Sequence, residues 1–364
     1  MAQAHCYAQG KAFLRRTVEP GELGTPTFSH LEGKFPLRLL TPQASSTNAT
    51  TGAARYGKVP VKGVGVLFVV NYGGGLVSGD HIDLDYDVGS HTRLLLLTQG
   101  STKVYCERRH GDPLAVSQRA HIEKPSSVQY FRYIVRPEAT LIILPAPVTC
   151  FARSRYVQTQ LIDLRSADTS SLVLLDWFTS GRMFVDGPKE STDMDRIPEF
   201  WHFYRYHSRN EVRVDGHIIA RDCLELSQDL PEKLIRGEPT ELSYRCAPYT
   251  CYATLILYGP EVSMLCDALQ KDFNAIQQHP YRVRSGNTKD PSRVGPPPLL
   301  WSLSSLGSCS TVPGKEPVKS SNPATGLILR LAGTDTDEMR GWLHEHLQPI
   351  SHLVGNDMYR MALG

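Results

Sequence analysis

The stretch VGVLFVVNYGGGLVSGDHIDLDYDV, residues 64–88, holds two different β-strand patterns joined by a glycine-rich turn. Its first part, VGVLFVV (64–70), is uniformly apolar, which predicts a strand covered on both faces. Its last part, HIDLDYDV (81–88), alternates strictly between polar and apolar residues, which predicts a strand with one buried face. The stretch therefore predicts a β architecture around it.

Short strand patterns continue as far as residue 226. The further segments are TRLLLLT (92–98), VQYFRYIV (128–135), TLIILP (140–145), YVQTQLID (156–163), LVLLDWF (172–178), NEVRVDG (210–216) and HIIARDCLEL (217–226). Gly, Pro or Asp separates them, and no helical period between them is long enough for a crossover helix. We therefore predict an all-β, or mainly β, fold with antiparallel or coiled sheets.

Two amphipathic helices are predicted near the C-terminus. In PEVSMLCDALQKDFNAI (260–276), apolar residues recur every three or four positions, and Pro260 suits the first helical position. TDTDEMRGWLHEHLQP (334–349) opens with Thr and Asp as capping residues and stops before Pro349. Both apolar faces are of the kind that packs against a core.

Composition excludes several classes of protein. The hydrophobic content of 41% and charged content of 21% are ordinary for a globular chain, and a net charge of +2 gives no field for steering nucleic acid. We find neither a signal-like apolar region at the start nor a stretch of roughly 20 apolar residues, so we expect a cytoplasmic protein without membrane contact. Residues 1–364 read as a single domain with polar surface insertions at about 41–58 and 282–323.

The glycine-rich turn does not match a phosphate-binding loop. Such loops precede a helix and usually a Lys, whereas the segment after Asp80 has the period of a strand. Asp80 shares parity with Ile82 and Leu84, so the carboxylate points inward if the strand register extends back to it. The alternative is that Asp80 caps its own turn.

Asp176 raises a similar question because it interrupts the apolar run LVLLDWF. It is either a strand-end Asp that holds the following turn or a second inward carboxylate. We find no nucleophile elbow, no HExxH helix and no Cys/His pairing, so the motifs supply no positive sign of an enzyme.

Several segments resemble one family, the urease accessory protein UreD (UreH), in its eukaryotic form with insertions. The paired motif is YGGGLVSGD (72–80) followed by LLLLTQGSTKVY (94–105), and the likeness continues through LIILPAPVTCF (141–151), LVLLDWFTSGRMF (172–184) and NEVRVDGHIIARDCLEL (210–226) to the closing helix. The motif residues that carry the resemblance are Gly74, Gly75, Gly79, Thr98, Gln99, Gly100, Lys103 and Tyr105.

The resemblance implies a non-enzymatic scaffold with an elongated, β-helix-like stack of short strands. It implies that the protein bridges apo-urease to a helical UreF-like accessory protein and a UreG-like nickel GTPase. It also implies a polar internal passage for transient Ni²⁺, with no tightly bound cofactor. Asp80, Asp83 and Asp176 are the candidate nickel-passage residues, although the parity of Asp83 points to the other face and bacterial members of the family commonly carry Glu at the position of Asp176.

Three interpretations remain open at this stage. The first is the nickel-insertion scaffold, and the second is a static interaction module in which Asp80 only caps a turn. The third is a β-helical hydrolase or lyase with Asp80 and Asp176 as paired carboxylates, which requires them to lie roughly 5 to 9 Å apart.

We expect the two insertions to be dispensable for folding. Deleting most of Gln43–Tyr56, or of Ser308–Ser320, should leave the thermal midpoint and urease activation nearly unchanged, because shortening a long polar surface loop costs little free energy. Deleting the apolar island Leu299–Leu306 should instead abolish folding. Loss of complex formation on removal of Gln43–Tyr56 would show that this segment is a binding element.

Overall fold

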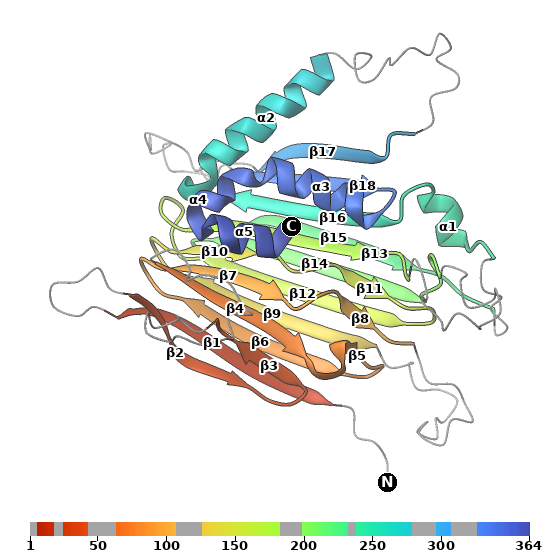
Figure 1. The fold of residues 1–364 in the computed structure, drawn as a ribbon, viewed down its shortest axis with the longest axis horizontal. Coiled ribbons are helices and arrows are strands. Elements are labelled where there is room, and N and C mark those ends of the chain that lie inside the picture. The colour runs from red at the N-terminus through yellow and green to blue at the C-terminus, as the bar shows by residue number, and fades with distance from the viewer. Residues whose placement is uncertain are drawn as a thin grey trace, which may run out of the picture.

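The computed structural model describes residues 6–17, 25–42, 63–106, 126–182, 199–231, 238–278, 296–306 and 326–364. These residues form three layers, two stacked β-sheets and a layer of helices over the second sheet (Figure 1). The mainly β class predicted from the sequence is confirmed. Among the described helices, none is long and apolar enough to cross a membrane.

The first sheet contains seven strands of the described chain, in the order β15-β14-β12-β9-β6-β1-β2. Their bounds are β1 (Tyr7–Thr17), β2 (Thr25–Gly33), β6 (His81–Val88), β9 (Ser127–Val135), β12 (Arg155–Leu164), β14 (Arg205–Val214) and β15 (His217–Ser227).

The second sheet follows the order β17-β18-β16-β13-β10-β7-β4-β3, with β5, β8 and β11 as a side ladder that joins it at β13. Its strands are β3 (Leu37–Leu40), β4 (Val64–Asn71), β5 (Gly75–Leu76), β7 (Arg93–Thr98), β8 (Thr102–Val104), β10 (Thr140–Ile143), β11 (Val148–Cys150), β13 (Ser171–Thr179), β16 (Cys251–Tyr258), β17 (Leu299–Leu306) and β18 (Gly326–Gly333).

The chain alternates between the two sheets from β4 to β14, and each sheet therefore grows by parallel pairing in its centre. No crossover helix is needed, because the opposite sheet supplies the return path between parallel neighbours. The outer strands pair in antiparallel fashion, as in β14 with β15 and β16 with β18. The sheets stay open and do not close on each other, so the β-helix-like stack is not confirmed.

Two apolar clusters explain the alternating and continuous patterns in the sequence. Between the sheets, the inward residues of β6 that include Leu84 and Tyr86 pack against the second sheet, as their alternation predicted. On the other face of the second sheet, Leu95 and Leu175 pack against the helices. Strands such as β13 are buried at every position because both of their faces are covered.

Most of the helices pack on the outer face of the second sheet, but one packs Leu242 into the cluster between the sheets. They are α1 (Glu241–Cys246), α2 (Ser263–Gln278), α3 (Thr336–His346), α4 (Ser351–Val354) and α5 (Asn356–Leu363), with short 3-10 turns at Tyr72–Gly74, Pro260–Val262 and Gln348–Ile350. Figure 1 shows α3, α4 and α5 gathered over the β16–β18 end of the second sheet. The two long helices match the predicted ones, and Asp335 caps α3 through the backbone N–H groups of Asp337 and Glu338.

The helix prediction was incomplete, because α1, α4 and α5 were not expected. Each is eight residues or fewer, which is too short for a periodic apolar pattern to stand out. The predicted insertions lie mostly outside the described residues. Within the second of them, the apolar island Leu299–Leu306 forms the edge strand β17, and Trp301 packs against Phe273 of α2.

Gly75 offers a test of the close packing between β5 and β8. A Cβ at this position would lie 2.2 Å from the Lys103 carbonyl oxygen, so Gly75→Ala should lower the free energy of unfolding by about 1–3 kcal/mol. Gly341→Ala is the matched control, because it sits in α3 with open space around it and should stabilise the protein by up to about 1 kcal/mol. Urea denaturation of both variants measures the two changes, and equal stability of Gly75→Ala and wild type would contradict the packing.

Candidate functional site

A buried carboxylate lies in the space between the two sheets. Asp176 is in the middle of β13, and its side chain contacts the first sheet. Its Oδ1 accepts a hydrogen bond from Nε2 of Gln158 at 3.1 Å. Its Oδ2 accepts from Oγ of Ser208 at 2.5 Å and from Nδ2 of Asn210 at 2.7 Å. Of the two alternatives for this residue, the structure shows the inward carboxylate.

Polar side chains on the inner face of the first sheet extend this network away from Asp176. The Tyr156 hydroxyl lies 2.8 Å from Oε1 of Gln158 and 2.6 Å from Oε1 of Gln129 on the neighbouring strand β9. In a parallel branch, Nε2 of Gln160 donates to Oδ1 of Asn210 at 3.0 Å. All these side chains are buried, and the network therefore runs through the core from β14 to β9.

A pocket of about 120 Å³ opens beside Asp176 at the β15 edge of the first sheet. Its lining includes a second carboxylate, Asp222 of β15, which accepts hydrogen bonds from Arg330 at 2.6 Å and from Oγ1 of Thr254 at 3.0 Å. The Arg330 side chain is 54% exposed, while that of Asp222 is 8% exposed. The pocket thus leads from the molecular surface at Arg330 to the buried carboxylate of Asp176.

The electrostatics of Asp176 follow from this environment. Burial raises the pKa of Asp176 above its ordinary value, the three hydrogen bonds lower it in part, and the nearby charge of Asp222 raises it further. Arg330, the cation in the pocket lining, is bound to Asp222 rather than to Asp176. A negative charge on Asp176 is therefore supported by neutral hydrogen-bond donors.

Asp80 lies immediately before β6 and is half-buried. Its Oδ2 accepts a hydrogen bond from the backbone N–H of Val77 at 2.8 Å, so the side chain caps its own turn. The Val77 carbonyl in turn accepts from Oγ of Ser127 at 3.0 Å, and Ser127 begins the inward face of β9 that continues at Gln129. Asp80 is also close to Cys6, whose thiol pKa is raised by burial and by the Asp80 charge.

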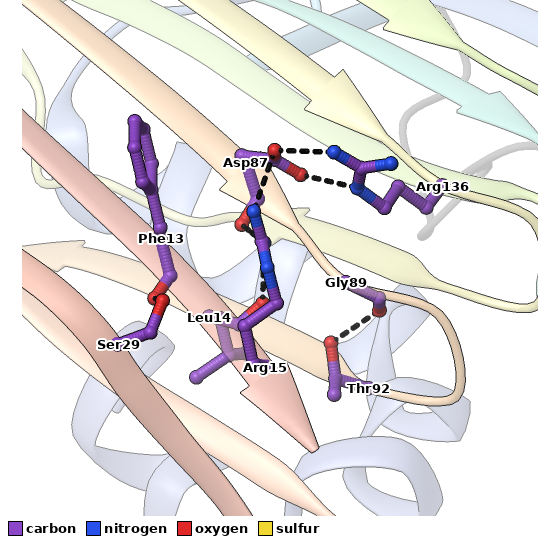
Figure 2. A network of polar contacts seen from close by, with 8 residues as sticks. All are labelled: Phe13, Leu14, Arg15, Ser29, Asp87, Gly89, Thr92 and Arg136. Atoms are coloured by element: carbon purple, nitrogen blue, oxygen red, sulfur yellow. Dashed lines mark hydrogen bonds and ion pairs between the residues drawn. The ribbon is translucent and has the colours of Figure 1, made fainter. Parts of the chain in front are cut away.

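Asp83 lies on the outer face of the first sheet. Its carboxylate accepts from the Tyr7 hydroxyl at 2.5 Å and lies 2.9 Å from Nε2 of His81. Asp87 on the same strand is held by Arg136 and Arg15 at 2.7–2.9 Å, as Figure 2 shows. Burial alone would raise the pKa of Asp87, but these two guanidinium groups outweigh it and hold that pKa below its ordinary value.

The motif residues gather where β4, β5 and β8 meet. The Tyr105 hydroxyl donates to the Gly73 carbonyl at 2.7 Å and so fixes the glycine-rich turn to β8. Gly74, Gly79 and Gly100 have φ of 72°, 91° and 75°, and Gly75 allows the close approach to Lys103 described above. Thr98 accepts from the Ala146 N–H at 2.8 Å, and Gln99 and Lys103 are exposed.

The potential metal ligands around Asp176 suit a weakly held cation better than a permanently bound one. Within the described part of the chain, no three His, Cys, Asp or Glu side chains come together as a metal-binding group. Asp176 and Asp222 instead offer carboxylates beside the hydroxyl oxygens of Ser208 and Thr254 in one pocket. Oxygen ligands of this kind hold a divalent first-row metal less firmly than thiolates or several imidazoles do.

Several residues of this site were missed in the sequence, namely Gln158, Ser208, Asn210 and Asp222. A signal was available in YVQTQLID and in the strand that begins RYHSRN, because Gln158 shares parity with Tyr156 and Ile162, and Ser208 with Tyr206 and Val212. Polar residues at the strand positions that otherwise carry the inward apolar side chains indicate a polar core. The pairing of Asp222 with Arg330 joins residues 108 positions apart and left no local signal.

The comparisons with known proteins indicate one family over most of the chain. A family model described as UreD urease accessory protein matches residues 22–362. Urease accessory protein 4 of Cryptococcus neoformans is 28% identical over 92% of this chain and 90% of its own length. Urease accessory protein D of Arabidopsis thaliana is 26% identical over 92% and 96%, and urease accessory protein UreD of Sorangium cellulosum is 30% identical over 96% and 84%.

These matches, over a β-sheet fold with a polar core, define a urease accessory protein, a class that serves urease maturation. Within that class, the chain belongs to the UreD urease accessory protein family. The resemblance noted in the sequence is thereby confirmed.

The two buried aspartates should respond to pH in opposite directions. The pKa of Asp176 is higher in the folded state than in the unfolded state. The protonated form therefore adds to the free energy of unfolding below about pH 4, and this contribution is lost as the pH rises through the folded-state pKa. Asp176→Asn should therefore gain stability relative to wild type between pH 4 and pH 7.5. The lowered pKa of Asp87 predicts the reverse: the stability that its ionised form contributes is fully present above about pH 4 and is lost as the pH falls through the folded-state pKa. Asp87→Asn should therefore be less stable than wild type above about pH 4, and the difference should shrink as the pH falls below that value.

Urea unfolding from below pH 4 to pH 7.5 measures both differences on the full chain. The same slope with pH for the two variants would contradict the assignment of a raised pKa to Asp176.

Proposed function

We propose that the protein is a urease-maturation scaffold that conducts nickel to apo-urease through the polar core between its sheets. In this role it bridges apo-urease to a UreF-like helical accessory protein and a UreG-like nickel GTPase, and we place this assembly in the cytoplasm. Nickel is the cargo of the protein and is held only in transit. The observation that carries the proposal is the carboxylate of Asp176, buried between the sheets yet adjoining a pocket that reaches the surface.

The energetic argument starts from the cost of burying a carboxylate. An uncompensated buried charge costs several kcal/mol, and in the described network Asp176 receives three neutral donors and no direct contact from a cation. A passing divalent cation supplies the missing positive charge. Because its other ligands would be water and hydroxyl oxygens, the same site releases the ion again.

A line of polar side chains supports a route through the core. It begins at Asp222 in the pocket, passes Asp176 and Gln158, and continues through the Tyr156 hydroxyl to Gln129. Beyond Gln129, Ser127 lies on the same inward face of β9 and donates to the Val77 carbonyl, whose own N–H binds Asp80. Two of the three candidate residues, Asp80 and Asp176, thus lie toward the two ends of this line of polar groups, whereas Asp83 lies on the outer face of the first sheet.

One observation favours the static interaction module as a second candidate. The Asp80 carboxylate caps its turn, which is the role that interpretation requires. The hydrolase interpretation has less support. Asp80 precedes β6, and Asp176 contacts β12 and β14, which lie two and three strands away in the first sheet. At about 4.8 Å per strand the two carboxylates are about 10–14 Å apart, beyond the spacing of a hydrolytic pair.

The proposal is tested by nickel transfer in the assembled complex. Asp176→Asn and Asp80→Asn should fold and bind all partners, yet load urease at least about tenfold more slowly, because each removes a unit charge that attracts Ni²⁺. Asp85→Asn is the matched control, since Asp85 is on the outer face of β6 with Arg132 and should transfer nickel normally. The measurement is nickel bound per urease active site against time, with pull-down yield and thermal midpoint recorded in parallel.

Full loading by intact complexes that contain Asp176→Asn would remove this carboxylate from the route. Loss of assembly together with loss of loading in Asp80→Asn would instead favour the static module.

A further inference from the structure

Strand β17 (Leu299–Leu306) is the last strand of the second sheet in the described chain, and it pairs with a neighbour, β18, on one side only. Apart from the side ladder, the other ends of the two sheets are β2, β3 and β15. Each of these carries charged residues or proline, such as Pro26 and Glu32 in β2, Arg38 in β3 and Arg221 in β15. The sequence of β17, LLWSLSSL, contains neither. An edge strand without such residues is open to pairing with another strand.

The direction of the backbone groups along β17 follows from its pairing with β18. The Thr334 N–H donates to the Pro298 carbonyl at 2.9 Å, and the next pair is Leu299 opposite Gly333. Backbone groups of successive residues in an antiparallel ladder point to alternate sides. The even-numbered residues of β17 therefore bond to β18, whereas the N–H and carbonyl groups of the odd-numbered residues point to the open edge. These odd-numbered residues are Leu299, Trp301, Leu303 and Ser305.

The side chains of β17 carry no charge on either side of the sheet. Trp301 and Leu303 lie on the helix side and pack against the apolar cluster there. Leu300, Ser302 and Ser304 lie on the opposite side and are exposed, with Leu300 at 54%. A second strand beside β17 would therefore contact apolar side chains on one side and apolar or small hydroxyl side chains on the other.

Helix α2 supplies an independent observation at the same edge. Its apolar face begins with Leu265 and Leu269, which are 3% and 1% exposed. The face continues with Phe273, whose ring centroid lies 5.1 Å from that of Trp301, and reaches Ile276, which is 40% exposed. Figure 1 shows α2 projecting beyond β17 at this edge. The last turn of the apolar face therefore passes the end of the second sheet, where a further strand would cover it.

We propose that two copies of the protein pair through β17 in antiparallel fashion, about a two-fold axis at Ser302. In this register Leu299 of one copy lies opposite Ser305 of the other. Trp301 lies opposite Leu303, so the apolar clusters under the helices of the two copies become continuous. Every N–H and carbonyl group at the open edge then has a hydrogen-bond partner, whereas a shift of two residues in either direction leaves some of them unpaired.

A second copy fits this edge better than an extended peptide from another protein. A peptide strand would satisfy the backbone of β17 but would not bring a second sheet under α2. The two-fold axis runs perpendicular to the sheet, so the helices of both copies lie on the same side and each α2 projects over the sheet of the other copy. The pairing is independent of the proposed nickel route, because none of the described residues that line the pocket beside Asp176 belongs to β17 or α2.

Disulfide trapping in the full-length protein tests the register. In Ser302→Cys the introduced thiol faces its own counterpart across the axis, at a Cα–Cα distance of about 4.5 Å that allows an intermolecular disulfide. Ser304→Cys is the matched control, because this position lies opposite Leu300 and about 14 Å from its own counterpart. Mild oxidation should give at least about tenfold more covalent dimer with Ser302→Cys than with Ser304→Cys, and the wild type shows the background from its own thiols.

Sedimentation equilibrium at micromolar concentration measures the dimer itself. Ser305→Pro should raise the dissociation constant of the dimer at least about tenfold, because proline removes an edge-facing N–H and its ring projects toward the paired strand. The fold of each copy should tolerate this proline, since the lost N–H points away from β18. Ser305→Ala is the matched control, because it keeps the N–H and should dimerise like wild type. Thermal midpoints show whether either variant disturbs the fold.

Three results would overturn the pairing of two copies. The first is a wild-type protein that stays monomeric at micromolar concentration, and the second is equal cross-linking of Ser302→Cys and Ser304→Cys, which would contradict the register. The third is a Ser305→Pro variant with an unchanged dimer but weaker binding to another protein of urease maturation, because β17 would then pair with that protein instead of a second copy.

Discussion

The burial of the Asp176 carboxylate constrains much of the structure around it. A charged side chain in an otherwise apolar strand is tolerated only when hydrogen-bond donors are held close to it. For Asp176 these donors are Gln158, Ser208 and Asn210, from two strands of the opposite sheet. Those donors need partners of their own, which Tyr156 and Gln160 supply. One buried charge thereby accounts for a line of polar side chains across a core that would otherwise be apolar.

The alternation of the chain between two sheets makes such a line possible. Parallel strands usually require helices on both faces of one sheet, but here the return path of each parallel pair is a strand of the other sheet. All the described α-helices except α1 then cover the outer face of the second sheet. The outer face of the first sheet is stabilised by ion pairs instead, such as buried Glu211 with Arg209, Arg213 and Arg221, which hold its pKa at about 2.

The sequence was sufficient for the faces of individual strands and for the long helices. The parity of Ile82, Leu84 and Tyr86 correctly identified the buried face of β6, and the periodicity of 260–276 and 334–349 located α2 and α3. The sequence was not sufficient to predict contacts between layers. The parity of a side chain identifies the face of the strand on which it lies, but it does not identify the strand that lies opposite in the other sheet. Asp176 could therefore be recognised as a buried carboxylate candidate, but its donors and the partnership of Asp222 with Arg330 depend on how the sheets stack.

Strand β13 lines a different pocket on each of its faces. Asp176 faces the first sheet, while Thr179, three residues later with opposite parity, lines a pocket of about 710 Å³ on the other side. The two positions are about 10 Å apart along one strand of the second sheet. A hydrogen-bonded sheet has no opening for an ion between strands, so the proposed nickel route runs along the space between the layers and not through β13.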